Sequence, residues 1–166
     1  MPTWHENDLK KQFQRAKDRG WIPFFEKAGK DYKFPTPILM AIASRETEMV
    51  NKMGDKGHGH GLMQIDDRSY PEWCHCGLWK DANAGIHQGV LVLDHWRETI
   101  RNGQGKKLKI RQSTFTGKPN LTNTELLRTA IAAYNSGLWA YWGLSERGDP
   151  DPDDRKRLFV RRSRAS

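Results

Sequence analysis

The chain reads TPILMAIASRET from residue 36 to residue 47, and this stretch decides the fold around it. Its apolar residues predict a helix. On a helix, Glu46 shares a face with three apolar residues that precede it: Leu39, Ile42 and Ala43. A carboxylate is seldom put on an apolar stripe without a partner or a chemical role. Because desolvation raises the pKa of a carboxyl group towards neutrality, Glu46 is a candidate general acid.

Turn signals surround this helix. Thr36 is expected to cap its start, with Pro37 in the first turn. After the helix, glycines at 54, 57, 59 and 61 exclude further helix and predict the turns of a small β-hairpin. Leu62 to Ile65 then reads as a short strand.

The rest of the chain is predicted to be mostly helical, without an internal repeat. Apolar residues at helical spacing predict further helices at 6–17, at 83–102 and from Thr122 or Asn123 through Tyr134. The other predictions are a broken stretch at 21–34, loops at 67–81 and 103–120, a turn at 148–152 and a basic helix or tail at 155–164. A length of 166 residues predicts a single domain over 1–166.

The composition describes a polar and basic protein. The net charge is +8 and the mean hydropathy is −0.85, so polyanions such as nucleic acid, anionic lipid or envelope polymers are attracted to the chain. The longest uncharged apolar run, Phe34 to Ser44, is far shorter than the roughly 20 residues of a membrane-spanning helix. The N-terminus has no basic segment followed by an apolar one, so no signal peptide is expected.

The cysteines and histidines offer little for a metal. Cys74 and Cys76 lie two residues apart, a spacing that seldom allows a disulfide, and we expect free thiols. His58, His60 and His75 invite a zinc interpretation. However, the ligands of Cys-His-Cys are too crowded to close one tetrahedron, so no metal site is predicted.

Four motifs follow one another along the chain: Ser44-Arg45-Glu46, Gly54-Asp55, Gly61-Leu62-Met63-Gln64-Ile65-Asp66 and Ala132-Ala133-Tyr134-Asn135-Ser136-Gly137. Together they resemble the goose-type lysozymes, within the wider family that includes the soluble lytic transglycosylases. The resemblance extends over about residues 5–162 and is weaker in the segments 67–84 and 103–120. A lone Ser-Arg-Glu would mean nothing, whereas four motifs in the same order are not expected by chance.

The resemblance implies a fold and a reaction. The implied fold is a mainly helical, lysozyme-like α+β fold, in which a small β-hairpin lies beside the active-site cleft of a helical bundle. The implied reaction is hydrolysis of the β-1,4 bond between N-acetylmuramic acid and N-acetylglucosamine. Such a chain would be a glycoside hydrolase, a bacteriolytic lysozyme, and would need no metal or organic cofactor.

The resemblance also assigns catalytic residues. Cleavage of a glycosidic bond needs an acid that protonates the leaving oxygen, and Glu46 matches it. An inverting enzyme needs a second carboxylate, about 6.5–9.5 Å away, that activates water on the opposite face. Asp55 and Asp66 match the aspartates that position this water in goose-type lysozymes. Transglycosylases generally lack them, so their presence favours hydrolysis with inversion.

Five residues are assigned to the substrate on the same basis. Met63 and Gln64 would form the cleft wall, with backbone groups bonding the N-acetyl sugar. Tyr134 would bond the acid or stack on a sugar, and Asn135 would support the backbone nearby. His60 stands where the family more often has an aromatic or apolar residue, so the cleft lining is expected to differ there.

Plainer interpretations stand beside these assignments. Asp66 could be an ordinary turn or cap residue, Asp55 an Asx-turn residue, Tyr134 a core residue and Gln64 a solvated strand residue. For the whole chain, the alternatives are a lytic transglycosylase that forms 1,6-anhydromuramic products, an inactive wall-binding relative, and a nucleic-acid-binding protein. No recognition motif supports the last of these.

The expected partners follow from the reaction and the charge. They are peptidoglycan glycan strands, for which N-acetylglucosamine oligomers are analogues, and anionic wall polymers drawn to the basic surface. No specific nucleic acid and no membrane span are expected. The chain is predicted to be a monomer that acts at the bacterial cell wall, secreted or released from the cytoplasm as a lysin.

Overall fold

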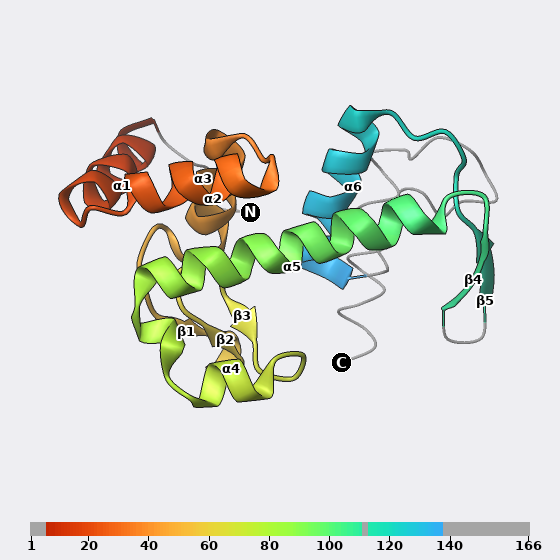
Figure 1. Cartoon of the computed structure of the whole chain (residues 1–166). Coiled ribbons are helices and arrows are strands. Elements are labelled where there is room, and N and C mark those ends of the chain that lie inside the picture. Colours follow the sequence, from red (N-terminus) through yellow and green to blue (C-terminus); the bar gives the residue numbers. More distant parts are fainter. Residues whose placement is uncertain (1–5, 111–112, 138–166) are drawn as a thin grey trace. The chain divides into compact units, whose positions relative to one another are not determined.

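The computed structural model describes residues 6–110 and 113–137 (Figure 1). Within them, two compact units meet in the sequence between Leu91 and Val92. Helix α5, Ala82–Gly103, contributes its first half to one unit and its second half to the other. A single domain over residues 1–166 stays a prediction.

Helices α1 (Glu6–Asp18), α2 (Ile22–Tyr32) and α3 (Thr36–Thr47) open the first unit, and α2 packs against α3. The helices predicted at 6–17 and from residue 36 are thereby confirmed. The broken stretch predicted at 21–34 is wrong, because α2 is a regular helix that tolerates its interior Gly29. A β-carbon on Gly29 would lie 2.6 Å from the carbonyl oxygen of Phe34, so only glycine fits at this corner.

The start of α3 differs by one residue from the prediction. Thr36 is the first helical residue and makes no side-chain cap; Pro35 occupies the cap position. The Pro35 carbonyl accepts from the amide of Ile38 at 3.0 Å, which begins the helical hydrogen bonds. Proline at the next position, Pro37, suits the first turn as predicted.

A three-stranded antiparallel sheet, called the site sheet below, follows α3 and confirms the predicted hairpin. Its strands are β1 (Met53–Gly54), β2 (Gly59–His60) and β3 (Ile65–Asp66), in that order across the sheet. Two details differ. One 3-10 turn over Asp55–Gly57 joins β1 to β2, where helix was excluded. The strand predicted at 62–65 is mostly a turn, because Gln64 has a φ of +53°, which interrupts the extended backbone.

The loop predicted at 67–81 contains two short helical elements. They are α4 (Pro71–His75), which begins at a proline and contacts β3, and a 3-10 turn over Leu78–Lys80. The long helix predicted at 83–102 is confirmed as α5. Its sequence predicts an inner face of Ile86, Val90, Leu91 and Leu93; the first two and Leu93 are buried, whereas Leu91 is only half-buried.

The core of the first unit gathers apolar side chains from α2, α3, the turn before β3 and the first half of α5. Its largest members are Phe25, Leu39, Met49, Leu62, Met63, Ile65, Ile86 and Val90. Helix α1 contributes Ala16 and the buried amide of Gln12. In contrast, Leu9 and Phe13, the other apolar residues at helical spacing, stay 46% and 52% exposed.

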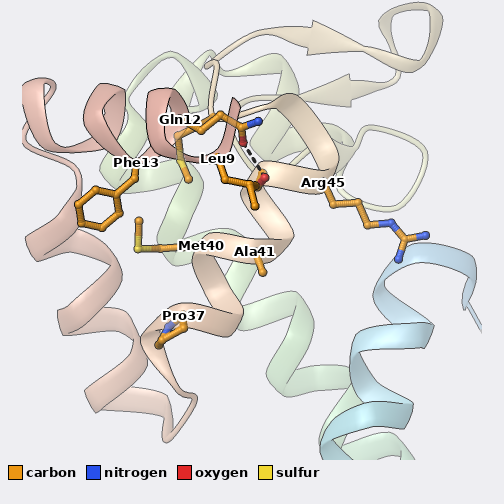
Figure 2. A pocket seen from close by; sticks show the side chains of 9 residues that line it. Leu9, Gln12, Phe13, Pro37, Met40, Ala41 and Arg45 are labelled. Carbon is orange, nitrogen blue, oxygen red and sulfur yellow. Dashed lines mark hydrogen bonds between the residues drawn. The ribbon is translucent and has the colours of Figure 1, made fainter. Parts of the chain in front are cut away.

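An apolar groove of about 350 Å³ lies between α1 and α3 and is lined by Leu9, Phe13, Pro37, Met40 and their neighbours (Figure 2). The hydroxyl of Ser44 donates to Gln12 Oε1 at 2.6 Å and connects the two helices. Arg45 extends away from the other labelled side chains (Figure 2).

The second unit contains an antiparallel hairpin and helix α6 (Asn123–Ser136). In the hairpin, β4 (Lys107–Ile110) pairs with β5 (Ser113–Thr116), so the loop predicted at 103–120 is wrong. The start of α6 confirms the prediction: Thr122 Oγ1 accepts from the amide of Glu125 at 3.1 Å, and Glu125 accepts from the amide of Thr122 in return.

The buried face of α6 is spaced as in an amphipathic helix and comprises Leu126, Thr129, Ala130 and Ala133. The turn predicted at 148–152 and the basic tail predicted at 155–164 lie outside the described residues. None of the described helices combines the length and the apolar character that a membrane crossing requires.

Candidate active site

Glu46 lies in the last turn of α3 and is half-buried. Leu39, Ile42 and Ala43, predicted on the same face, are all buried, which confirms the apolar surroundings of the carboxyl group. Burial raises the pKa of Glu46, and the neighbouring charge of Arg45 opposes this only in part. The negative end of the helix dipole also favours the neutral acid. Among the described residues, none makes a hydrogen bond to the Glu46 carboxyl group.

The end of α3 is held to the turn that precedes β3. Thr47 is 1% exposed, and its Oγ1 lies 2.8 Å from the carbonyl oxygen of Leu62 and 3.0 Å from that of Ala43. On the other side, Arg15 Nη1 donates to the carbonyl oxygen of Glu48 at 2.8 Å. These bonds fix the helix end that carries Glu46 relative to the segment that leads to Asp66.

The site sheet is thin enough for one side chain to lie across it. Its register aligns Gly54, Gly59 and Asp66 in a row over the three strands. Gln64 covers this row: a β-carbon added to Gly54 or Gly59 would lie 2.4 or 2.1 Å from Gln64 Oε1. Gln64 Nε2 donates to the carbonyl oxygens of Lys52 and Gly61, both at 2.9 Å.

The two aspartates predicted from the sequence, Asp55 and Asp66, are brought together by Arg68, which was not predicted to belong to the site. Arg68 Nε donates to Asp66 Oδ1 at 2.8 Å, and Arg68 Nη2 donates to Asp55 Oδ2 at 3.0 Å. Asp66 also accepts from the amide of Arg68 at 3.2 Å and from Ser69 Oγ at 3.4 Å. Asp66 thus has the local contacts of a turn residue while it faces Asp55 through a shared cation.

A hydrogen bond between a histidine and an aspartate lies beside this arrangement. His58 Nδ1 and Asp67 Oδ1 are 2.8 Å apart, and the amide of Asp67 donates to the carbonyl oxygen of His58 at 2.9 Å. The bond with His58 lowers the pKa of Asp67. Asp67 is therefore engaged elsewhere and does not compete with Asp55 and Asp66 for Arg68.

Two of the side chains proposed to bind substrate are buried in the first unit. Met63 and His60 are buried, at 0% and 3% exposure, so their side chains belong to the interior. Met63 contacts α5 at Gly89, where an added β-carbon would lie 2.5 Å from the methionine sulfur. His60 packs edge-to-face against Trp79 with ring centroids 5.8 Å apart. A backbone contact of residue 63 with sugar stays a prediction.

The remaining two proposed residues belong to the second unit. Tyr134 and Asn135 lie near the end of α6, and both are half-buried. They are thus in a different unit from Glu46, and their roles stay predictions. Within the first unit, the structure brings together Asp55, Asp66 and the unpredicted Arg68.

The cysteines form no disulfide, as predicted. Cys74 is buried, and desolvation raises the pKa of its thiol to about 11, so the thiol is unreactive at neutral pH. Cys76 is exposed. Among the described residues, no three His, Cys, Asp or Glu side chains are grouped so that they could hold a metal ion.

Sequence reasoning missed Arg68 and Thr47 as parts of this region. Arg68 follows Asp66 by two residues, a spacing at which an Asx-type turn brings a side chain back to the carboxylate. That local signal was available in the sequence. The bond from Arg68 to Asp55, thirteen residues earlier in the chain (68 − 55), depends on the hairpin register and could not be predicted from local spacing.

The fold and the site define a class of protein. A mainly helical chain, in which a half-buried glutamate ends a helix next to a small antiparallel sheet with paired aspartates, has the lysozyme-like α+β fold. Comparison with known proteins narrows this class. No family model matches the chain.

Several curated proteins match. Lysozyme G of Dromaius novaehollandiae is 29% identical over 127 residues, which cover 74% of this chain and 53% of that protein. Lysozyme g of Gallus gallus is 31% identical over 105 residues, which cover 61% of this chain and 41% of that protein. A protein named X polypeptide from Escherichia coli is 35% identical over 78 residues, 42% of this chain and 46% of that protein.

These matches show that the chain is related to the goose-type lysozymes, as the four motifs indicated. The chain spans about half the length of the curated relatives that it matches.

Proposed function

We propose that this chain is a peptidoglycan muramidase that hydrolyses the β-1,4 bond between N-acetylmuramic acid and N-acetylglucosamine with inversion. The observation that carries the proposal is the environment of Glu46. This carboxyl group is half-buried, lies at the end of a helix, and has a raised pKa. Since a general acid must still be protonated near neutral pH, this environment suits proton donation to a glycosidic oxygen.

The second half of the reaction is assigned to the site sheet. When the leaving oxygen is protonated by Glu46, the sugar carbon develops positive charge and is attacked by water from the opposite face. Asp55 and Asp66 supply carboxylates that orient this water and accept its proton. Their shared contact with Arg68 supports the pairing. The named lysozyme relatives support the choice of substrate.

The setting of the activity belongs to the same proposal. Peptidoglycan glycan strands are the substrate, and N-acetylglucosamine oligomers serve as analogues. The net charge of +8 attracts the protein to anionic wall polymers. The protein acts at the bacterial cell wall as a bacteriolytic enzyme of the endolysin or antimicrobial kind.

The test is mass spectrometry of the fragments that the wild-type protein releases from purified peptidoglycan. Hydrolysis adds the elements of water to the products, whereas a lytic transglycosylase would leave 1,6-anhydromuramic ends. We expect hydrated products, and Glu46→Gln should lower their rate of release by about 10²–10⁴-fold. Glu48→Gln, which alters an exposed carboxylate two residues away, is the matched control and should keep full activity. Products with 1,6-anhydro ends would show that the protein is a lytic transglycosylase. The absence of released products would favour an inactive wall-binding relative.

Glu46→Gln, which should lower the activity, should raise the stability of the folded protein at neutral pH. Because the pKa of Glu46 in the folded protein is raised above 4.5, the folded state binds a proton more tightly than the unfolded state. The ionised carboxyl group therefore costs stability above pH 4.5 and costs nothing below it. Glu46→Gln should raise the Tm at pH 7 and leave it unchanged at pH 3.5 to 4, as followed by circular dichroism. An equal Tm at pH 7 would contradict the burial of the charge.

A further inference from the structure

Arg68 is joined to both carboxylates that the proposed reaction uses, although no motif singled it out. Two different guanidinium nitrogens make the bonds: Nε reaches Asp66 at 2.8 Å and Nη2 reaches Asp55 at 3.0 Å. The side chains of Arg68, Asp55 and Asp66 are 58%, 65% and 40% exposed. The three side chains therefore lie at the surface, where a glycan strand and water can reach them.

Stability is a poor explanation for this arrangement. Exposed ion pairs contribute about 0–1 kcal/mol each, because water screens the charges and the side chains lose freedom. What an arginine between two carboxylates does provide is geometry. Its planar guanidinium has donors in fixed directions, and its positive charge offsets the repulsion between two neighbouring anions.

The two aspartates depend on Arg68 to different degrees. Asp66 has further donors close by, the amide of Arg68 and the hydroxyl of Ser69. Among the described residues, Arg68 is the donor that reaches the Asp55 carboxylate. Asp55 also has a φ of +48° and is followed by Lys56 at +53°, conformations that residues with a β-carbon adopt rarely and at some energetic cost. Without Arg68, the side chain of Asp55 should lose its fixed position.

The bonds of Arg68 leave one oxygen of each carboxylate outside them, Oδ1 of Asp55 and Oδ2 of Asp66. Asp66 Oδ2 accepts from Ser69 Oγ at 3.4 Å, and a carboxylate oxygen can accept a second hydrogen bond. A water molecule that donates a hydrogen bond to each of these oxygens would be held in one orientation. The neighbouring carboxylate of Asp67 is paired with His58. The other cation of the turn, Lys56, follows Asp55 in the chain.

We propose that Arg68 is a positioning residue of the hydrolytic site, which holds Asp55 beside Asp66 so that the carboxylate oxygens that Arg68 does not bond, Oδ1 of Asp55 and Oδ2 of Asp66, orient the attacking water. The inference rests on the proposed function. Arg68 does not touch the reacting atoms and acts through the aspartates, above all through Asp55. Its removal should therefore slow the chemical step and leave substrate binding nearly unchanged.

A double-mutant cycle tests this route. Apparent kcat and KM are measured with soluble glycan strands for Arg68→Ala in the wild-type, Asp55→Asn and Asp66→Asn backgrounds. Arg68→Ala alone should lower kcat by about ten- to a hundredfold with KM within about twofold, since misplaced groups of this kind cost up to about 10²-fold. In the Asp55→Asn background the same change should lower kcat by less than about twofold, because the group it positions is already gone.

Two further variants separate positioning from folding. Arg68→Lys should recover part of kcat, because one ammonium group can bond to a carboxylate but lacks the fork that spans both. Lys27→Ala removes another exposed ion pair of this unit, with Asp31 on α2, and should leave kcat and Tm unchanged. The Tm of Arg68→Ala should lie within a few degrees of the wild type, as expected for exposed pairs.

The outcomes distinguish this inference from the function on which it rests. If Arg68→Ala lowers kcat by the same factor in the wild-type and Asp55→Asn backgrounds, Arg68 does not act through Asp55 and the inference is overturned. Full activity of either Arg68→Ala or Asp55→Asn overturns it as well, while wild-type release of hydrated fragments would keep the muramidase function. A wild-type protein that releases no fragments overturns the proposed function itself, and the inference with it.

Discussion

Two small antiparallel sheets of this chain are held together in different ways. In the site sheet of the first unit, each strand has two residues, and the register comprises two paired positions per strand pair. In the hairpin of β4 and β5, each strand has four residues, and four positions pair from Lys107 with Thr116 to Ile110 with Ser113. The site sheet therefore has much less backbone pairing with which to maintain its shape.

Side chains supply what the backbone of the site sheet lacks. Gln64 bonds two carbonyl groups across the glycine row, Arg68 joins the turn of β1 to the end of β3, and His58 pairs with Asp67. A sheet held in this way has its carboxylates already fixed in position. The comparison indicates that the shape of the site sheet and the orientation of the proposed catalytic aspartates depend on the same contacts.

The largest effect on stability is expected at Gly117, which closes the base of the β4–β5 hairpin. A β-carbon there would lie 2.0 Å from the carbonyl oxygen of Gly103 and 2.9 Å from its carbonyl carbon. Since both atoms are backbone, the hairpin or the end of α5 would have to move. Gly117→Ala should lower the free energy of unfolding by about 3 kcal/mol or more, as measured by denaturant titration. A loss below about 1 kcal/mol would mean that the backbone of this hairpin yields easily, and the contrast with the site sheet would fail.

A smaller effect is expected at Gly59, in the middle strand of the site sheet. The added β-carbon would lie 2.1 Å from Gln64 Oε1, the end of a side chain that can swing away. The cost is then the loss of the two bonds made by Gln64 Nε2, about 1–3 kcal/mol.

The control for Gly59→Ala is the same change in a Gln64→Ala background. There the alanine meets no amide, and the free energy of unfolding should change by less than about 0.5 kcal/mol. Equal costs in the two backgrounds would show that Gln64 is not the side chain that Gly59 accommodates. Both variants are compared by the same denaturant titration, at a pH where Glu46 has one protonation state.

The part of this comparison that was predictable from sequence is local. The periodicity of residues 36–47 identified the buried face of Glu46, the glycine spacing identified the hairpin, and Thr122 was one of two residues proposed to begin α6. The hairpin of β4 and β5 was missed because its charge suggested a surface loop. The alternation Lys-Leu-Lys-Ile at 107–110, followed by β-branched residues at 114 and 116, carried the strand signal.

The contacts that shape the site were harder to predict because they join residues whose separation is set by the fold. The strand predicted at 62–65 implied alternating faces, but the turn there buries Leu62 and Met63 in succession. The same turn gives Gln64 its left-handed φ and sends its amide back over the glycines. A pattern of period two does not predict this geometry. It does not predict the pairing of Arg68 with Asp55 either.

The smallest effect is expected from the pair of His58 and Asp67. Their variants test whether this hydrogen bond contributes to the stability of the site sheet. The hydrogen bond from His58 lowers the pKa of Asp67 below 3.8, so the folded state favours the ionised carboxylate. The contribution of this hydrogen bond to folding stability is therefore fully present above about pH 4 and is lost as the pH falls through the lowered pKa of the folded state.

Asp67→Asn should leave a protein whose Tm falls less steeply than that of the wild type between pH 5 and pH 2.5. His58→Gln should flatten the same limb, and the double variant should behave like either single one, because both changes remove one interaction. Additive losses would show that the two side chains act independently, and that their mutual contact does not contribute to the stability of the site sheet.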